Sequence, residues 1–195
     1  MKKTLITILA TVLVCCCVVG GTLAWLTDKS ETVTNTFTVG DIEITLTETE
    51  RTYKMVPGNE LPKDPKVTVL ANSEACWLFV QVTKSANFDT YLTFETADGW
   101  TKLADDGDNN ASTTVYYRKV DATTADVPYY FLKAGATTEA ANGCVKVIDT
   151  LTAAQLEAAE TTNPTLAFTA YAVQQENISD VATAWTNAKT AVANP

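Results

Sequence analysis

The chain of 195 residues contains no histidine and few basic residues. Without an imidazole side chain it cannot build a Ser-His-Asp triad, a Cys-His nucleophile pair or an HExxH zinc site. Its 14 Lys and Arg residues face 23 Asp and Glu residues, which gives a formal net charge of -9. Proteins that bind nucleic acid present basic surfaces instead. These two shortages exclude the familiar histidine-dependent hydrolases and argue against nucleic-acid binding.

Recognisable catalytic motifs are missing as well. The sequence has no GxSxG, SxxK, P-loop or GxGxxG pattern. An enzyme would have to rely on a pair of carboxylates, and nothing in the sequence selects a pair from the 23 acidic residues. We therefore expect a protein that is not an enzyme, with no catalytic residues and no cofactor.

Residues 1–24 have the pattern of a secretory signal peptide. A basic head precedes an uncharged run from Thr4 to Gly21, and Thr22-Leu23-Ala24 then fits an A-x-A-like cleavage site. We predict cleavage between Ala24 and Trp25, and a protein that contacts the membrane only through this segment. The alternatives are a retained anchor, since the run is about as long as the shortest membrane-spanning helices, and a lipoprotein modified within Cys15–Cys17.

Only Cys76 and Cys144 remain after this cleavage. Two cysteines in an exported protein permit one disulfide. Two buried free thiols that pack as small apolar residues are the alternative, and the sequence leaves both open. Catalytic use of either thiol is not expected, because no histidine is present to act as its base.

The rest of the chain predicts short strands, because Thr-rich and aromatic segments alternate with turn signals. In Asn35–Glu48 the apolar residues change parity at Gly40-Asp41, which predicts a bulge or bend there. Cys76–Thr83 is apolar on both faces in its first half, which indicates a central strand. Further strands are predicted at Lys66–Leu70, Tyr91–Glu95, Val115–Val120, Tyr129–Leu132, Cys144–Ile148 and Thr165–Gln174.

Two helices interrupt this pattern. Thr152–Gln155 has the form of a capping box, and Ser179 is predicted to cap a helix over residues 180–192 with one apolar stripe. The predicted fold is mostly β: a jelly-roll-like antiparallel β-sandwich with one or two short α-helices, preceded by the N-terminal signal helix. The predicted organisation is a signal peptide at 1–24, an extended N-terminal arm at 25–36 and a single sandwich domain at 37–195.

An acidic loop and two tyrosine pairs are candidate ligand sites. Asp105, Asp106 and Asp108 lie in an oxygen-rich loop that could hold calcium, but the loop lacks the Glu that closes an EF-hand, so a solvated hairpin loop is the better interpretation. The aromatic pairs Tyr116-Tyr117 and Tyr129-Tyr130 could line a sugar-binding face. Cross-strand packing explains these pairs equally well.

The run from Gly21 to Leu46 resembles the signal-and-first-strand signature of the TasA/camelysin family, with GTLAWLTD followed by NTFTVGDIEITL. Segments further along the chain look like parts of uncharacterised clostridial-type members of that family. These segments are VPG at Val56–Gly58, KDP at Lys63–Pro65, SEACWLFV at Ser73–Val80, VYYR at Val115–Arg118, LAFTAYAVQ at Leu166–Gln174 and AW at Ala184-Trp185. The resemblance therefore extends over most of the chain.

This resemblance implies a protein exported by a Gram-positive bacterium and processed by a SipW-type signal peptidase. It implies a jelly-roll-like subunit of biofilm matrix fibres, secreted to the extracellular matrix or cell surface. In such fibres the N-terminal arm of one subunit adds a strand to the next, so the partners are further copies of this chain or related matrix subunits. Here the arm would run from Trp25 to about Thr36, with Trp25, Leu26 and Val33 as candidate donor-strand residues.

Two other functions stay open beside the fibre subunit. One is a monomeric or cell-surface binding module for a polysaccharide or a protein partner, in which the arm is a flexible terminus. The other is a secreted peptidase, since camelysin relatives have been classed as metalloendopeptidases. The sequence argues against this last function, because a catalytic zinc without any histidine ligand is unusual.

Overall fold

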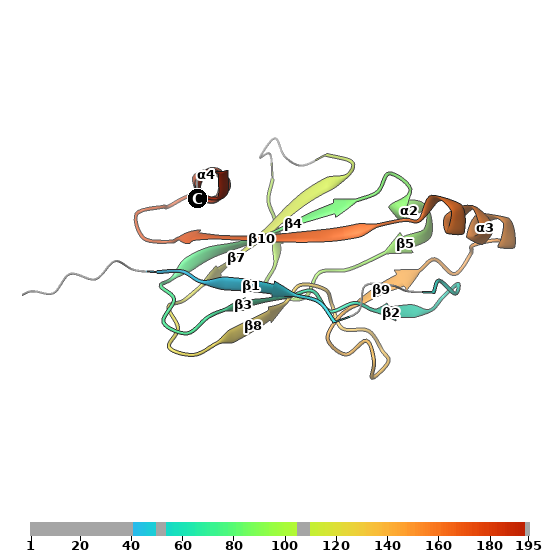
Figure 1. Ribbon diagram of the computed structural model, residues 1–195, viewed down its shortest axis with the longest axis horizontal. Helices are drawn as coiled ribbons and strands as arrows, with labels where there is room; N and C mark the ends of the chain where they lie inside the picture. Colours follow the sequence, from blue (N-terminus) through green and yellow to red (C-terminus); the bar gives the residue numbers. More distant parts are fainter. Residues whose placement is uncertain (1–40, 50–53, 105–109, 194–195) are drawn as a thin grey trace, which may run out of the picture. The chain divides into compact units, whose positions relative to one another are not determined.

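The computed structural model describes residues 41–49, 54–104 and 110–193 (Figure 1). These residues all belong to one compact unit, Val39–Pro195. The predicted signal peptide with its Ala24-Trp25 cleavage site lies outside the described residues. So do the predicted arm, including Trp25, Leu26 and Val33, and the calcium candidates Asp105, Asp106 and Asp108.

The described residues form ten strands in three antiparallel sheets, which confirms the predicted mostly β fold and is consistent with a β-sandwich. The largest sheet has the order β10 (Leu166–Gln174), β4 (Cys76–Lys84), β7 (Thr113–Val120) and β6 (Thr101–Lys102). A second has the order β1 (Ile44–Thr47), β3 (Lys66–Val69) and β8 (Val127–Tyr130). The third has the order β2 (Glu60–Pro62), β9 (Cys144–Val147) and β5 (Leu92–Thr93).

Strand β4 is buried on both of its faces, as its sequence predicted. Cys76, Leu78 and Val80 point into the main core between the sheets, together with Val67 and Val69 of β3. The alternate residues of β4 point to the opposite face, where they join a second core cluster. A strand covered on both faces needs apolar residues at successive positions, which explains why this segment does not alternate.

The second cluster is closed by α4 (Val181–Ala193), which lies on the face of the largest sheet that is turned away from β1, β3 and β8 (Figure 1). Trp185 is 1% exposed, and its ring centroid lies 5.2 Å from that of Phe79 and 5.0 Å from that of Tyr171. The predicted cap, Ser179, is off by one residue. Asp180 caps the helix instead, because its Oδ1 accepts the Thr183 N–H at 2.9 Å.

Of the other two helices, the start of α3 (Ala153–Thr162) was predicted, whereas α2 (Phe88–Tyr91) lies where a strand was predicted. The capping box of α3 is confirmed, since the side chains of Thr152 and Gln155 each accept the backbone N–H of the other. The strand predicted at Tyr91–Glu95 is only partly present. The short helix α2 occupies its start, and only the two residues of β5 follow as strand.

Candidate functional site

The two sides of the sandwich differ in how their edge strands are protected. β1 and β10, edge strands of their two sheets, contact each other (Figure 1), and the opposite edges of these sheets are β8 and β6. An edge strand presents unpaired backbone N–H and C=O groups, which invite pairing with another chain. We call the β8–β6 side the closed side and the β1–β10 side the open side.

On the closed side, three features protect the strand edges from pairing with another chain: an outward-facing proline, a side-chain hydrogen bond to an outward carbonyl, and a short edge strand. Phe131 N–H donates to Pro65 O at 2.9 Å, so the odd-numbered residues in this part of the chain turn their backbone groups toward β3. Pro128 and Tyr130 therefore face outward, and proline offers no N–H there. The outward carbonyl of Tyr130 accepts the Trp100 Nε1–H at 2.9 Å. The other edge on this side, β6, is only two residues long.

In the part of the chain that the structure describes, β10 on the open side has none of these protections. This strand has nine residues, LAFTAYAVQ, with no charge, no proline and no glycine, and among the described strands it pairs only with β4. Gln175 N–H donates to Ala75 O and Ser85 N–H donates to Thr165 O, which fixes the odd-numbered residues as those bonded toward β4. The even-numbered residues turn their N–H and C=O groups outward: Leu166, Phe168, Ala170, Ala172 and Gln174.

No backbone hydrogen bond joins these outward groups of β10 to another residue in the described part of the chain. The adjacent strand β1 is shorter, with four residues. Leu70 N–H donates to Glu43 O at 2.9 Å, so Ile44 and Leu46 of β1 turn their backbone groups away from β3. The Leu46 side chain is also 37% exposed. The open side is therefore a candidate site for strand addition.

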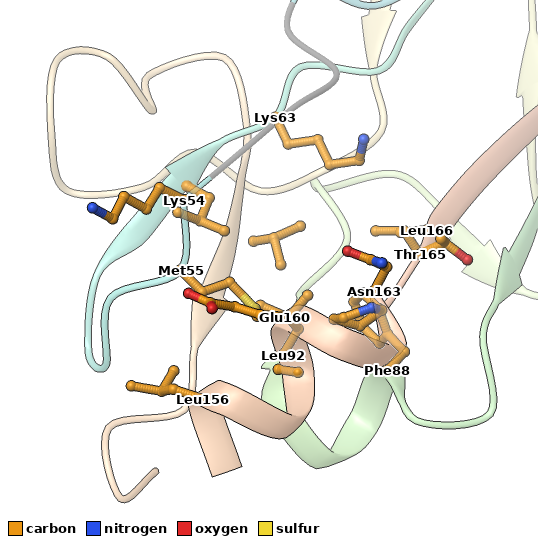
Figure 2. A pocket seen from close by; sticks show the side chains of 14 residues that line it. Lys54, Met55, Lys63, Phe88, Leu92, Leu156, Glu160, Asn163, Thr165 and Leu166 are labelled. Carbon is orange, nitrogen blue, oxygen red and sulfur yellow. The ribbon is translucent and has the colours of Figure 1, made fainter. Parts of the chain in front are cut away.

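A pocket of about 710 Å³ lies where α3 and α2 meet the β2-β9-β5 sheet and the start of β10 (Figure 2). Most of its lining is apolar, including Met55, Leu61, Phe88, Leu92, Leu156 and Leu166. Lys63 lies on one side of this lining, and Glu160 and Asn163 of the α3 region on the others. The Lys63 Nζ forms an ion pair with Glu48 and lies 5.4 Å from the Phe168 ring centroid. The pocket has the size and lining of a small-ligand site.

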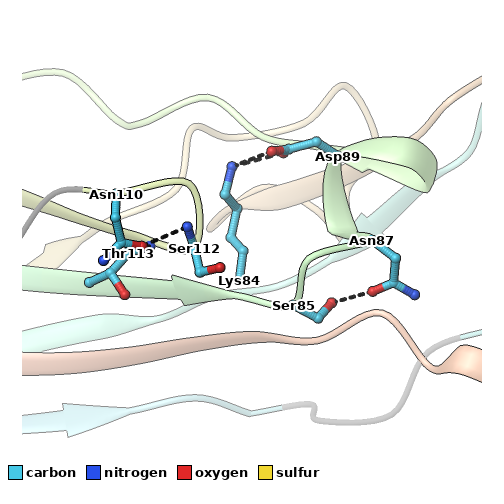
Figure 3. A network of polar contacts seen from close by, with 7 residues as sticks. All are labelled: Lys84, Ser85, Asn87, Asp89, Asn110, Ser112 and Thr113. Carbon is cyan, nitrogen blue, oxygen red and sulfur yellow. Dashed lines mark hydrogen bonds and ion pairs between the residues drawn. The ribbon is translucent and has the colours of Figure 1, made fainter.

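The loop predicted as a possible calcium site borders a described network of polar contacts (Figure 3). Asn110 Oδ1 accepts the N–H groups of Ser112 and Thr113 at 2.8 and 2.9 Å, which fixes the start of β7. Nearby, Lys84 Nζ pairs with Asp89 at 2.6 Å. Among the residues that the structure describes, no three Cys, Asp or Glu side chains gather as metal ligands.

The paired tyrosines lie mostly in the packing between strands. The ring centroid of Tyr116 is 5.2 Å from that of Phe131, and that of Tyr117 is 5.9 Å from that of Trp77. The guanidinium carbon of Arg118 lies 4.2 Å from the Tyr129 ring centroid. These contacts favour the cross-strand packing interpretation over a sugar-binding face.

Cys76 and Cys144 are free thiols on different sheets. Cys76 points into the main core, and burial raises the pKa of its thiol to about 11. Cys144 is half-buried, and its pKa is raised by burial first and by nearby Glu60 and Glu95 second. Neither thiol has the lowered pKa of a reactive cysteine.

We expect iodoacetamide at pH 8 to modify Cys144 of the folded protein well before Cys76. The thiolate is the reacting form, and at pH 8 a thiol of pKa about 11 is ionised at roughly one part in a thousand. Mass spectrometry of the two cysteine peptides over time measures the order. In urea both thiols should react at similar rates. Equal rates in the folded protein, or no labelling until a reductant is added, would contradict the placement of the two thiols.

None of the helices within residues 41–49, 54–104 and 110–193 combines the length and the apolar character of a membrane span. A family model described as camelysin metallo-endopeptidase matches residues 1–74 of the chain. No curated protein and no solved structure matches it. The matched region contains the predicted signal and arm, and it continues through β1, β2 and β3. The resemblance to the TasA/camelysin family, first drawn from Gly21–Leu46, is thereby confirmed over residues 1–74.

Proposed function

We propose that this protein is a secreted structural subunit of extracellular matrix fibres. In this proposal the chain is cleaved between Ala24 and Trp25 during export, and the arm Trp25–Thr36 of each copy adds a strand to the next copy. The observation that carries the proposal is the open side of the sandwich. Soluble β proteins protect long apolar edges, and this chain does so at β8 and β6, whereas within the described residues β10 pairs along one edge only, with β4.

The dimensions of the arm are compatible with such an addition. An extended arm of about twelve residues reaches about 40 Å, whereas a nine-residue strand such as β10 spans about 30 Å. Strand addition gains affinity from backbone hydrogen bonds and specificity from alternate side chains. Because the arm and its acceptor are different surfaces, the contact does not close on itself, and repeated addition produces a filament.

The peptidase activity in the family's description is not part of this proposal. A metallopeptidase needs a metal centre, and the chain has no histidine to supply its usual ligands. The described residues do not fit a catalytic zinc either, because no three of their acidic or thiol side chains converge. We therefore derive no reaction step for this protein.

The pocket favours a second candidate function, a binding module. Its volume of about 710 Å³ and its mostly apolar lining resemble a small-ligand site more than a polysaccharide-binding surface. The two candidates make different demands on the arm. A fibre subunit needs the arm to assemble, whereas a binding module keeps its function when the arm is removed.

Electron microscopy of purified Trp25–Pro195 beside a chain that starts at Phe37 tests the proposed function. We expect filaments from the longer chain and none from the shorter one. Circular dichroism and a urea titration serve as the control that the shorter chain is folded. If both chains stay folded and monomeric at high concentration, assembly into a homopolymer is ruled out and the pocket becomes the leading site.

A further inference from the structure

We propose that the pocket beside α3 binds the aliphatic chain of a single-chain amphiphile whose head group carries no net charge and lies at the rim. Monoacylglycerols and lysophosphatidylcholines share this chemistry. The inference rests on the second candidate function, the binding module, and is independent of fibre assembly. Three features of the pocket support it: the packing of α3, the placement of polar residues and the charges at the rim.

Helix α3 covers the pocket without a large buried side chain of its own. Of its ten residues only Ala159 is buried and only Leu156 is half-buried, and the others are exposed. By contrast, α4 fills its contact with the largest sheet by means of Trp185. Helices in proteins gain most of their stability from packing an apolar face. An apolar ligand beneath α3 would therefore supply contacts that the helix does not make with its own large side chains.

Polar contacts fix both ends of α3 in place. The helix begins at the capping box of Thr152. At its other end, Thr162 Oγ1 accepts the Asn87 Nδ2–H at 2.8 Å. Ser85 Oγ accepts the Thr165 N–H at 2.9 Å, which ties the chain after α3 to the residue that follows β4. Because the helix is held from its ends, its middle can line a preformed site.

Most polar residues of the pocket lie at its rim, and most of its buried residues are apolar (Figure 2). The one buried polar residue in the described lining is Lys63, whose Nζ is paired with Glu48. The other polar lining residues are exposed: Lys54, Glu160, Asn163 and Thr165. The buried apolar lining residues are Leu61, Phe88, Leu92, Val145 and Ala159. A base of apolar side chains under a polar rim suits a molecule with an apolar body and a polar head.

The apolar lining favours an aliphatic chain over a planar ring. Met55, Leu156 and Leu166 are half-buried, so their aliphatic side chains are within reach of a ligand. The aromatic residue of the described lining, Phe88, is 1% exposed and packs edge-on against Phe94. It therefore offers a planar ligand little surface for stacking. Flexible methionine and branched leucine side chains can follow the shape of a methylene chain.

The charges around the pocket favour a head group without net charge. The charge of Lys63 is balanced by Glu48, and the other charged residues of the described lining are one cation, Lys54, and one anion, Glu160. The chain as a whole has a net charge of -9, which repels an anionic head such as a fatty-acid carboxylate. A hydroxyl-bearing or zwitterionic head meets no such repulsion, and the exposed amide and hydroxyl groups of the rim can hydrogen-bond to it.

Isothermal titration calorimetry of Trp25–Pro195 with 1-monoacylglycerols tests the aliphatic site. The probes carry eight-, ten- and twelve-carbon chains and are used below the concentrations at which they aggregate. We expect the dissociation constant to fall about fourfold for each added methylene, because each methylene buries a similar apolar area. Failure of all the probes to bind, or an affinity that does not depend on chain length, would overturn the proposal.

Probes that share the twelve-carbon chain test the head group. They are the 1-monoacylglycerol, the lysophosphatidylcholine and the fatty acid itself, at neutral pH. We expect the first two to bind about tenfold more tightly than the fatty acid. Whichever of the two binds more tightly identifies an uncharged or a zwitterionic head as the better fit. A fatty acid that binds as tightly as either of them would overturn the assignment of the head.

Variants of α3 test the location of the site. Leu156→Asp places a charge in the pocket lining, and its matched control Ala158→Asp places the same charge on the exposed side of the helix. We expect the first to weaken binding of the twelve-carbon monoacylglycerol about tenfold or more. The control should stay within about twofold of the parent protein.

A second lining variant, Ala159→Leu, keeps the pocket apolar and occupies part of its volume. It is also expected to weaken binding about tenfold, because it displaces methylene groups of the ligand. This variant decides the location even if the new charge in Leu156→Asp detaches the helix, and circular dichroism shows which variants are folded. Unchanged affinity in a folded Ala159→Leu protein would place the bound chain elsewhere and overturn the pocket as its site.

The same titration with the chain that starts at Phe37 separates this inference from the fibre proposal. The described lining residues begin at Lys54, so we expect equal affinity in the two chains, with or without filaments. If filaments form and the monoacylglycerol does not bind, this inference alone fails. If the monoacylglycerol binds and no filaments form, the fibre proposal alone fails. Loss of binding from a folded chain that lacks residues 25–36 would contradict a site built from the described lining.

Discussion

Replacing Phe131 by alanine is expected to lower the free energy of unfolding by about 3–5 kcal/mol. Phe131 is 0% exposed and lies directly after β8, in the main core. Its ring centroid lies 5.2 Å from that of Tyr116, 5.3 Å from that of Trp100 and 5.5 Å from that of Phe168. Three edge-to-face contacts cannot re-form around a methyl group, so the cavity persists.

Urea unfolding followed by fluorescence measures this loss. Tyr130→Ala is the matched control, because Tyr130 is the preceding residue and its ring has Lys66, at 6.0 Å, as a described ring contact. Its backbone carbonyl, which accepts the Trp100 N–H, is retained in the alanine variant. We expect the control to lose about 1 kcal/mol or less. Equal losses from the two variants would mean that Phe131 does not join the sheets.

Replacing Trp185 by alanine is expected to cost a similar 3–5 kcal/mol and to release α4 from the sheet. Trp185 fills the contact between α4 and the outer face of the largest sheet, against Phe79 and Tyr171. Without it, α4 retains two buried alanines, Ala184 and Ala188, which bury little apolar surface. Release of the helix exposes Trp77 and Phe79 on β4.

Unfolding in urea and binding of a hydrophobic dye before the transition measure these two effects. Asn187→Ala is the control, since Asn187 lies on the exposed face of the same helix. This variant should bind no more dye than the parent protein and should unfold within about 0.5 kcal/mol of it. A Trp185→Ala protein with the stability of the parent would show that α4 contributes little to the fold.

The elements that sequence reasoning found are those with strong local signals. β4 was predicted as central because apolar residues on both faces can only be covered from both sides. The capping box at Thr152 was predicted because its two hydrogen bonds depend on four consecutive residues alone. The short strands β2 and β6 were missed, since two or three residues show no periodicity.

The candidate site was less predictable, for a physical reason. The uncharged composition of Leu166–Gln174 is visible in the sequence, but whether that strand is central or at an edge depends on the order of strands in the sheet. That order is set by contacts between distant segments. The pocket likewise joins Lys54 and Leu61 to Leu166, and no local pattern brings these residues together.

The pairing of β10 with β4 also has a consequence for the order of folding. Tyr171 and Gln81, which hydrogen-bond across this pair, are 90 residues apart in the chain. Closing so long a loop is slow, so the largest sheet forms late and only after nearly the whole polypeptide is available. A chain that ends before Leu166 leaves β4 with one uncovered edge and one bare apolar face. We therefore expect such C-terminal truncations to aggregate rather than to yield a smaller folded domain.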